Sequence, residues 1–182
     1  MICMDAIDSL VEEFRLITGF LRDGGQISLS IDVDRHFKKV IILSSASYFE
    51  YRIQNILIGF VAEKSGNNNE LISFFKKRAI GMQYHSLFTW GEKNDPDKPG
   101  KNANTFLSLF GDEFKQKVGQ EINNNDVLSE AMKAFLEIGH LRNILVHSNF
   151  AVYPMDDNIT SDEIYGLHKK GRVFVEFIEG KL

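Results

Sequence analysis

Long segments in which apolar residues recur every three to four positions are the feature that most limits how this chain can fold. This spacing places apolar side chains on one face of an α-helix, and that face must pack against other elements. Polar breaks containing glycine or asparagine separate the segments, as is typical of helix ends. The sequence therefore predicts an all-α domain, with its main helices at residues 5–21, 34–63, 70–86 and 126–147 and shorter ones at 102–110 and 112–122.

Two short segments depart from this helical pattern. Residues 26–33 alternate apolar and polar side chains, which is typical of a short strand or an extended connection. Residues 173–178 are rich in Val and Phe and form the best strand candidate of the chain. Between them, Thr160 and Glu163 have the spacing of a capping box, which predicts a short helix. We therefore expect minor β segments near residues 26–33 and 173–178.

Size, charge and cysteine content exclude several classes of protein. A chain of 182 residues with 43% hydrophobic residues is long enough for one domain with its own core. The single Cys3 excludes an intrachain disulfide framework and a multi-cysteine metal cluster. The acidic N-terminal segment and the short uncharged stretches predict neither a signal peptide nor a membrane span. We expect a cytoplasmic protein without a membrane partner.

The predicted helix at residues 126–147 carries the candidate site. At about 100° per residue, His140, Asn143 and His147 lie within an arc of ~60°, opposite the apolar face. Imidazoles can exchange protons near neutral pH, and an amide can orient them by a hydrogen bond. Arg142 lies ~140° from His147, on the apolar side of the helix. A guanidinium placed there needs a carboxylate or a subunit interface.

Glu50 is the predicted partner of that guanidinium. It lies on the apolar stripe of the helix at 34–63, where a hydrophobic residue is expected. A buried carboxylate requires compensation, so we expect Glu50 to meet Arg142 across packed helices. Arg142 could reach the face of His147 if its stem wraps around the helix, if the helix loosens near Ser148, or if a second protomer supplies it.

The segment from His140 to His147 contains Arg142-Asn143-x-x-x-His147, which resembles the signature of the HEPN superfamily. Residues 43–50 and 104–111 resemble segments of its RiboL-PSP and MAE types, so the likeness covers roughly residues 36–150. The resemblance implies one HEPN-like helical bundle over residues 1–182, with its core at about 36–150. It also implies a homodimer in which two Arg/His motifs line one cleft.

The resemblance further implies a metal-independent endoribonuclease of toxin or defence type. In that activity Arg142, Asn143 and His147 would be catalytic, and Glu50 and His140 would support them. Attack by the 2′-OH of RNA would leave 2′,3′-cyclic phosphate and 5′-OH ends, without a cofactor or a metal. The expected partners are RNA, a second copy of the chain, and an antitoxin or regulatory protein.

Other functions compete with this interpretation. A non-catalytic HEPN module that binds a protein or RNA is the main alternative, and an unrelated helical scaffold is the third. The sequence contains no Gly-rich phosphate loop, no Gly-x-Ser-x-Gly elbow and no His-Glu-x-x-His motif, so NTPase, serine hydrolase and zincin readings lack support. Surface or capping roles are expected for the isolated histidines His36, His85 and His168, and packing is expected for the central aromatic residues Tyr84, Phe88 and Trp90. The lysine clusters are typical of solvated faces, and they are also the local positive charge that an RNA substrate would need: Lys76–Arg78, Lys98/Lys101, Lys115/Lys117 and Lys169–Arg172.

Overall fold

The computed structural model describes residues 6–77, 84–91, 100–155 and 159–182, and these are mostly helical, as predicted. In the described ranges, β structure is limited to one isolated bridge between Thr89 and Asn102. Cys3, Arg78 and Lys98 lie outside these ranges. The helices are α1 (Ala6–Asp23), α2 (Ile27–Lys64), α3 (Asn69–Phe75), the short 3-10 helix η2 (Tyr84–Ser86), α4 (Asn104–Ser108), α5 (Asp112–Asn123), α6 (Asp126–His147) and α7 (Ser161–Glu179).

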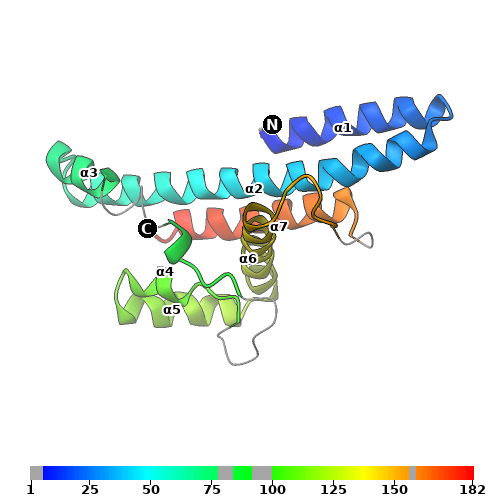
Figure 1. The fold of residues 1–182 in the computed structure, drawn as a ribbon. Coiled ribbons are helices and arrows are strands. Elements are labelled where there is room, and N and C mark those ends of the chain that lie inside the picture. The colour runs from blue at the N-terminus through cyan, green and yellow to red at the C-terminus, as the bar shows by residue number, and fades with distance from the viewer. Residues whose placement is uncertain (1–5, 78–83, 92–99, 156–158) are drawn as a thin grey trace.

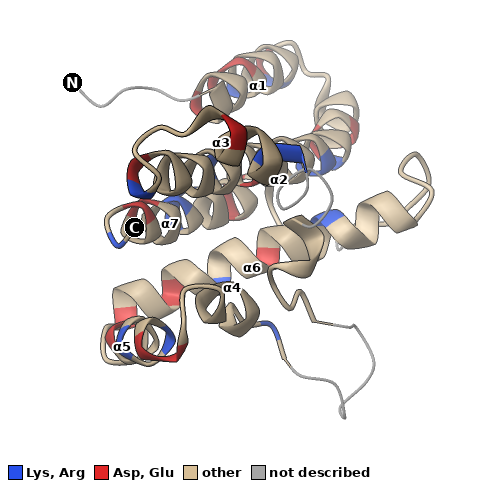
Figure 2. Ribbon diagram, turned by 90° about the vertical axis from the view of Figure 1, so that its left-hand side faces the viewer, with Lys and Arg blue, Asp and Glu red and all other residues tan. Residues whose placement is uncertain are grey.

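The long helix α2 organises the molecule (Figure 1). Its N-terminal part pairs with α1 in an antiparallel hairpin, and its central part lies beside α7. Helix α6 packs most extensively against α7 and crosses both α2 and α7 steeply, as the two views of Figures 1 and 2 agree. Helices α4 and α5 pack beside α6 on the side away from the hairpin. Because α2 and α6 cross at the centre, Glu50 and the motif helix come together.

The expected β segment at residues 26–33 is wrong, because α2 begins at Ile27. The alternation of apolar residues does not mark a buried strand face, since Ile27 and Ile31 are both more than half exposed. Ser30 is instead buried, and its Oγ accepts a hydrogen bond from Nε of Arg22 at 3.2 Å. A short alternating run fits a helix turned with its polar side inward as well as it fits a strand.

The expected strand at residues 173–178 is also wrong, because this segment is the last part of α7. The predicted capping box does start a helix: Thr160 Oγ1 accepts from the Glu163 amide at 3.1 Å, and the Glu163 carboxylate accepts from the Thr160 amide at 2.7 Å. The helix then continues well beyond a short segment, because its buried residues keep helical spacing: Ile164, His168, Gly171, Phe174, Val175 and Ile178. Packing of this face overrides the β propensity of Val and Phe.

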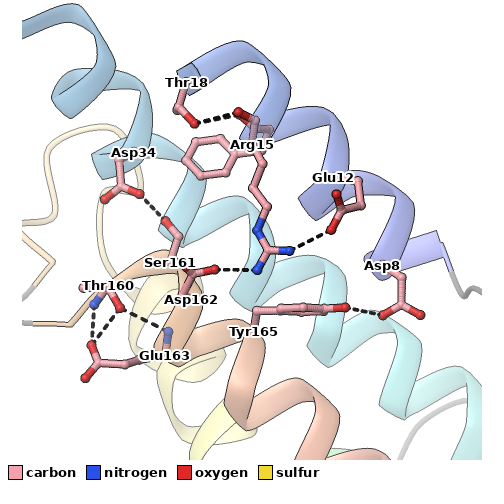
Figure 3. A network of polar contacts seen from close by, with 11 residues as sticks. Asp8, Glu12, Arg15, Thr18, Asp34, Thr160, Ser161, Asp162, Glu163 and Tyr165 are labelled. Carbon is pink, nitrogen blue, oxygen red and sulfur yellow. Dashed lines mark hydrogen bonds and ion pairs between the residues drawn. The ribbon is translucent and has the colours of Figure 1, made fainter. Parts of the chain in front are cut away.

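The start of α7 is tied to α1 and α2 by a polar network (Figure 3). Arg15 of α1 forms ion pairs at 2.7 Å with Glu12 and with Asp162 of α7. Tyr165 Oη donates to Asp8 Oδ1 at 2.7 Å, and Ser161 Oγ donates to Asp34 of α2. This network fixes the first turn of α7 against the α1–α2 hairpin.

The described helices do not include one with both the length and the apolar content required to cross a bilayer.

Candidate functional site

The predicted site residues lie at the C-terminal end of α6, which is helical as far as His147. Arg142 and Asn143 are half-buried, as is His140, whereas His147 is exposed. Ser148 follows with an extended backbone (φ −111°, ψ 164°), so the helix ends directly after the last motif residue. The motif therefore spans the boundary between the core and the solvent.

The guanidinium of Arg142 turns toward the polar face of its own helix. Its Nη1 donates to Oδ1 of Asn143 at 3.2 Å and lies 3.5 Å from Nδ1 of His85. Because α6 stays regular over this turn, the long stem accounts for the reach. This is the first of the three routes considered for Arg142.

The expected partner Glu50 shares a small pocket with Arg142. The pocket is lined by Glu50 of α2, His85 of η2 and Arg142 and Asn143 of α6, between the aromatic walls of Trp90 and Phe135. Among the described residues, the hydrogen bonds of the guanidinium go to His85 and Asn143, and Glu50 instead accepts from Gln54 Nε2 at 3.2 Å. The carboxylate thus influences the site through its field without a direct ion pair to Arg142.

The pocket is too small to hold a nucleotide. Its volume of ≈ 10 Å³ is room for about one water molecule. A phosphate group would therefore meet Arg142 at the mouth of the pocket, where His85 is exposed to solvent.

His85 is the site residue that sequence reasoning missed, and Trp90 holds it in place. The Trp90 indole donates from Nε1 to the backbone carbonyl of His85 at 2.9 Å. The six-membered ring of the same indole packs closely against α6, where a Cβ on Gly139 would come within 2.0 Å of Trp90 Cζ3. A glycine inside the motif helix, one turn before Arg142, is the sequence signal that could have indicated this close approach.

The charges around the pocket influence the protonation of its titratable groups. Partial burial lowers the pKa of His85, and the charge of Arg142 lowers it further; Glu50 acts in the opposite direction, and His147 adds a smaller lowering effect. Burial also raises the pKa of Tyr84 far above its usual value. At neutral pH, His85 is therefore neutral, and the Tyr84 phenol keeps its proton.

The turn after His147 is held by a buried lysine. Lys39 of α2 is 2% exposed, and its Nζ donates to the carbonyl of Phe150 at 2.7 Å. Within the turn, Asn149 Oδ1 accepts from the Ala151 amide at 3.2 Å. The chain is thereby fixed on the far side of His147.

The other histidines and the aromatic residues have different places. His168 was expected at the surface or in a cap, but it is fully buried and stacks on Phe49 with the ring centroids 5.3 Å apart. His36 is exposed, as expected. The expectation of packing is confirmed for Tyr84, Phe88 and Trp90, which are all buried in the core. They are therefore not available to stack on bases.

Basic and acidic residues are interspersed over the described helices rather than gathered on separate faces (Figure 2). Lys101 pairs with Glu137 of α6, and Lys170 lies 3.6 Å from Glu130. Arg172 lies 3.6 Å from both Asp8 and Glu176. Acidic neighbours thus reduce the field of the expected Lys169–Arg172 cluster, while Lys76 and Lys77 are exposed after α3.

The arrangement can bind an anion and exchange protons. Arg142 offers a charged fork at the pocket mouth, and His85 offers an imidazole beside it. His147 is exposed further along the same helix and lies near enough to influence the pKa of His85. In the described part of the chain, no cluster of three His, Cys, Asp or Glu side chains is placed to bind a metal ion.

The family model of RiboL-PSP-HEPN proteins matches residues 8–182. The match extends into the N-terminal and C-terminal regions, beyond the 36–150 core on which the resemblance rested. Neither the curated proteins nor the solved structures include one that matches the chain.

Proposed function

The chain belongs to the RiboL-PSP-HEPN family, and from this membership and the geometry around Arg142 we propose that it is a metal-independent endoribonuclease of toxin or defence type. The observation that carries the proposal is a guanidinium whose hydrogen-bond partners are neutral, Asn143 and His85. A cation held by neutral groups at a pocket mouth keeps its charge available for an anion. The phosphodiester of RNA is such an anion.

The chemistry needs only proton transfer and stabilisation of charge. The 2′-oxygen attacks phosphorus and its proton passes to an imidazole, while the bond from phosphorus to the 5′-oxygen breaks and that oxygen receives a proton. His147 would carry out one of these transfers, a role typically worth ~10²–10⁴-fold in rate. His147 of the partner subunit would carry out the other. Arg142 would stabilise the negative charge on the phosphate oxygens, with Asn143 orienting it.

The proposed homodimer has an apolar surface available to it. Large hydrophobic side chains are exposed on α1 and on the first turns of α2, including Leu16 (74% exposed) and Phe20 (79% exposed). Several exposed apolar side chains on two neighbouring helices can contribute to an interaction surface. Phe20→Glu is expected to convert the dimer to a monomer in analytical ultracentrifugation. A wild-type chain that sediments as a monomer would contradict the dimer.

Cleavage of RNA in the presence of EDTA tests the proposed activity. Wild type, His147→Ala and Lys133→Ala would be incubated with total RNA, and the fragment ends tested for 2′,3′-cyclic phosphate. Lys133 is an exposed residue of the same helix, so its variant controls for preparation and folding. We expect cleavage by wild type and Lys133→Ala, and a loss of ~10²-fold or more in His147→Ala.

Two outcomes would contradict the proposal. Equal cleavage by all three proteins would indicate a contaminating nuclease or another site. Cleavage by none would favour the alternative, a HEPN module that binds a protein or RNA without cutting, which the exposed apolar side chains of α1 would also serve.

A further inference from the structure

His85 has no assigned role in the proposed reaction, although it lies at the centre of the site. It reaches Arg142 from a segment 57 residues away in the chain, and η2 and Trp90 hold its backbone there. Its ring is exposed at the mouth of the pocket. A residue positioned by a buried indole and a close helix contact is built into the site rather than placed there by a flexible loop.

The contact with Arg142 favours one tautomer of His85. A guanidinium has only donors, so a hydrogen bond between Arg142 Nη1 and Nδ1 of His85 requires the imidazole nitrogen to accept. A neutral imidazole that accepts at Nδ1 carries its proton at Nε2. The ring therefore presents an N–H donor beside the cation.

We propose that His85 and Arg142 form one phosphate-binding unit, in which Nδ1 of His85 orients the guanidinium and the Nε2–H donates to a phosphate oxygen. The ligand is an RNA phosphodiester, so the inference deepens the proposed ribonuclease function and rests on it. Two donors at a fixed angle can contact two oxygens of a tetrahedral phosphate at once, which a single donor cannot do.

The charged groups around His85 favour the neutral ring that this role requires. Arg142 and His147 face it from α6 and disfavour a second positive charge, whereas Glu50 faces it from α2 and favours one. Tyr84, on the same short helix, keeps its phenol proton at neutral pH. Arg142→Ala should therefore raise the pKa of His85, and Glu50→Gln should lower it.

NMR of the histidine side chains tests the tautomer independently of any activity. Long-range ¹H–¹⁵N spectra of the full chain at neutral pH should show His85 as the Nε2–H tautomer, with the pKa changes just stated in the two variants. Inorganic phosphate should shift the His85 signal in wild type but not in Arg142→Ala. An Nδ1–H tautomer, or no shift with phosphate, would overturn the inference.

Three substitutions separate binding from proton transfer. In His85→Asn the amide oxygen lies near the place of Nδ1, in His85→Gln the amide nitrogen can take the place of Nε2, and His85→Ala removes both. We expect His85→Ala to bind a non-cleavable 2′-O-methyl oligoribonucleotide about tenfold more weakly, with each amide variant restoring part of the loss. Equal loss of cleavage in all three variants with unchanged binding would overturn the inference in favour of an acid or base role.

The two proposals fail in different ways. If wild type cleaves no RNA but phosphate still shifts His85, the ribonuclease function fails and the phosphate-binding unit stands. If RNA is cleaved through His147 but His85→Ala binds and cleaves as wild type does, the unit fails and the function stands.

Discussion

Lys39 and Arg142 are two cations in largely apolar surroundings, and they differ in their burial and in the length of their hydrogen bonds. Lys39 is 2% exposed; its ammonium donates to the Phe150 carbonyl at 2.7 Å and lies 5.3 Å from the centroid of the Phe150 ring. Arg142 is half-buried, and its bonds are longer, at 3.2 Å to Asn143 and 3.5 Å to His85. Lys39 has one short hydrogen bond and a second contact at 3.5 Å with the carbonyl of Ala151, whereas both contacts of Arg142 are long.

We interpret the difference as that between a structural charge, Lys39, and a charge proposed to bind a ligand, Arg142. A buried charge with a short hydrogen bond to the backbone stabilises the segment that supplies the acceptor, here the turn after α6. A charge held loosely by neutral groups at a pocket mouth has lost part of its hydration without full compensation, so an incoming anion can supply the rest. Removal of Lys39 should therefore affect stability, and removal of Arg142 should affect function.

The largest expected effect is on the functional side of this comparison. Arg142→Ala should reduce RNA cleavage by about 10²–10³-fold, because in the proposed reaction it removes the charge that stabilises the phosphate in the transition state. Its free energy of unfolding should change by less than about 1 kcal/mol, since no close ion pair is lost. Initial rates and urea unfolding on the same preparations measure both. A large loss of stability with unaltered cleavage would reverse the roles assigned to the two cations.

Lys39→Ala should have the next largest effect, and we expect it on stability rather than on RNA cleavage. The substitution leaves the Phe150 carbonyl without its donor and opens a cavity beside α2, so we expect a loss of about 2–4 kcal/mol in the free energy of unfolding. Lys39→Met fills most of the volume and should lose about 1–3 kcal/mol. Lys133→Ala, at an exposed position on α6, is the matched control. If Lys39→Ala unfolds at the same urea concentration as that control, the structural role is wrong.

A substitution at Gly139 tests whether Trp90 is a rigid wall of the pocket, as the orientation of Arg142 by His85 requires. A Cβ there would clash with the Trp90 ring, so Gly139→Ala should cost about 1–3 kcal/mol of stability by overpacking and should displace His85 from Arg142. Gly166→Ala on α7 meets nothing within 4 Å and should stabilise by about 0.5–1 kcal/mol through helix propensity. Unfolding curves and the tryptophan emission of the two variants provide the measurement. Equal behaviour of the two variants would show that Trp90 has room to move.

Helical periodicity predicted the main helices but not all of their bounds. Helix α2 begins at Ile27 rather than at residue 34, and α3 ends at Phe75 within the helix expected over 70–86, of which residues 78–83 lie outside the described ranges. The helix at 126–147 has the predicted bounds, and the stripe that includes Glu50 does face the motif helix. Residues 26–33 and 173–178 were misassigned because a short apolar run carries both helical and strand signals, and tertiary packing decided between them.

The site was predicted only where it is local to α6. The positions of Arg142 and His147 follow from their spacing on one helix, whereas the approach of His85 depends on how Trp90 packs against Gly139. Helix geometry predicted that Glu50 and Arg142 lie near each other, but only the atomic positions show that the two side chains form no direct ion pair. Burial of His168 likewise depends on α7 being a long helix rather than a short one followed by a strand.

The smallest expected effect is at the start of α7, where the exposed carboxylate of Glu163 accepts hydrogen bonds from the amide and hydroxyl of Thr160. Thr160→Ala removes the cap and should cost about 1 kcal/mol of stability.

The amide and hydroxyl of Thr160 lower the pKa of Glu163, so the carboxylate form favours the folded state. Its contribution is complete above the unfolded pKa of about 4.3 and is lost as the pH falls through the lower folded value. Urea midpoints of wild type should therefore fall more than those of Glu163→Gln between pH 6 and pH 3. If the two pH profiles are parallel, the hydrogen bonds of Glu163 at this exposed cap do not contribute to the free energy of unfolding. The contribution expected for the hydrogen bond of Lys39 would then depend on its burial.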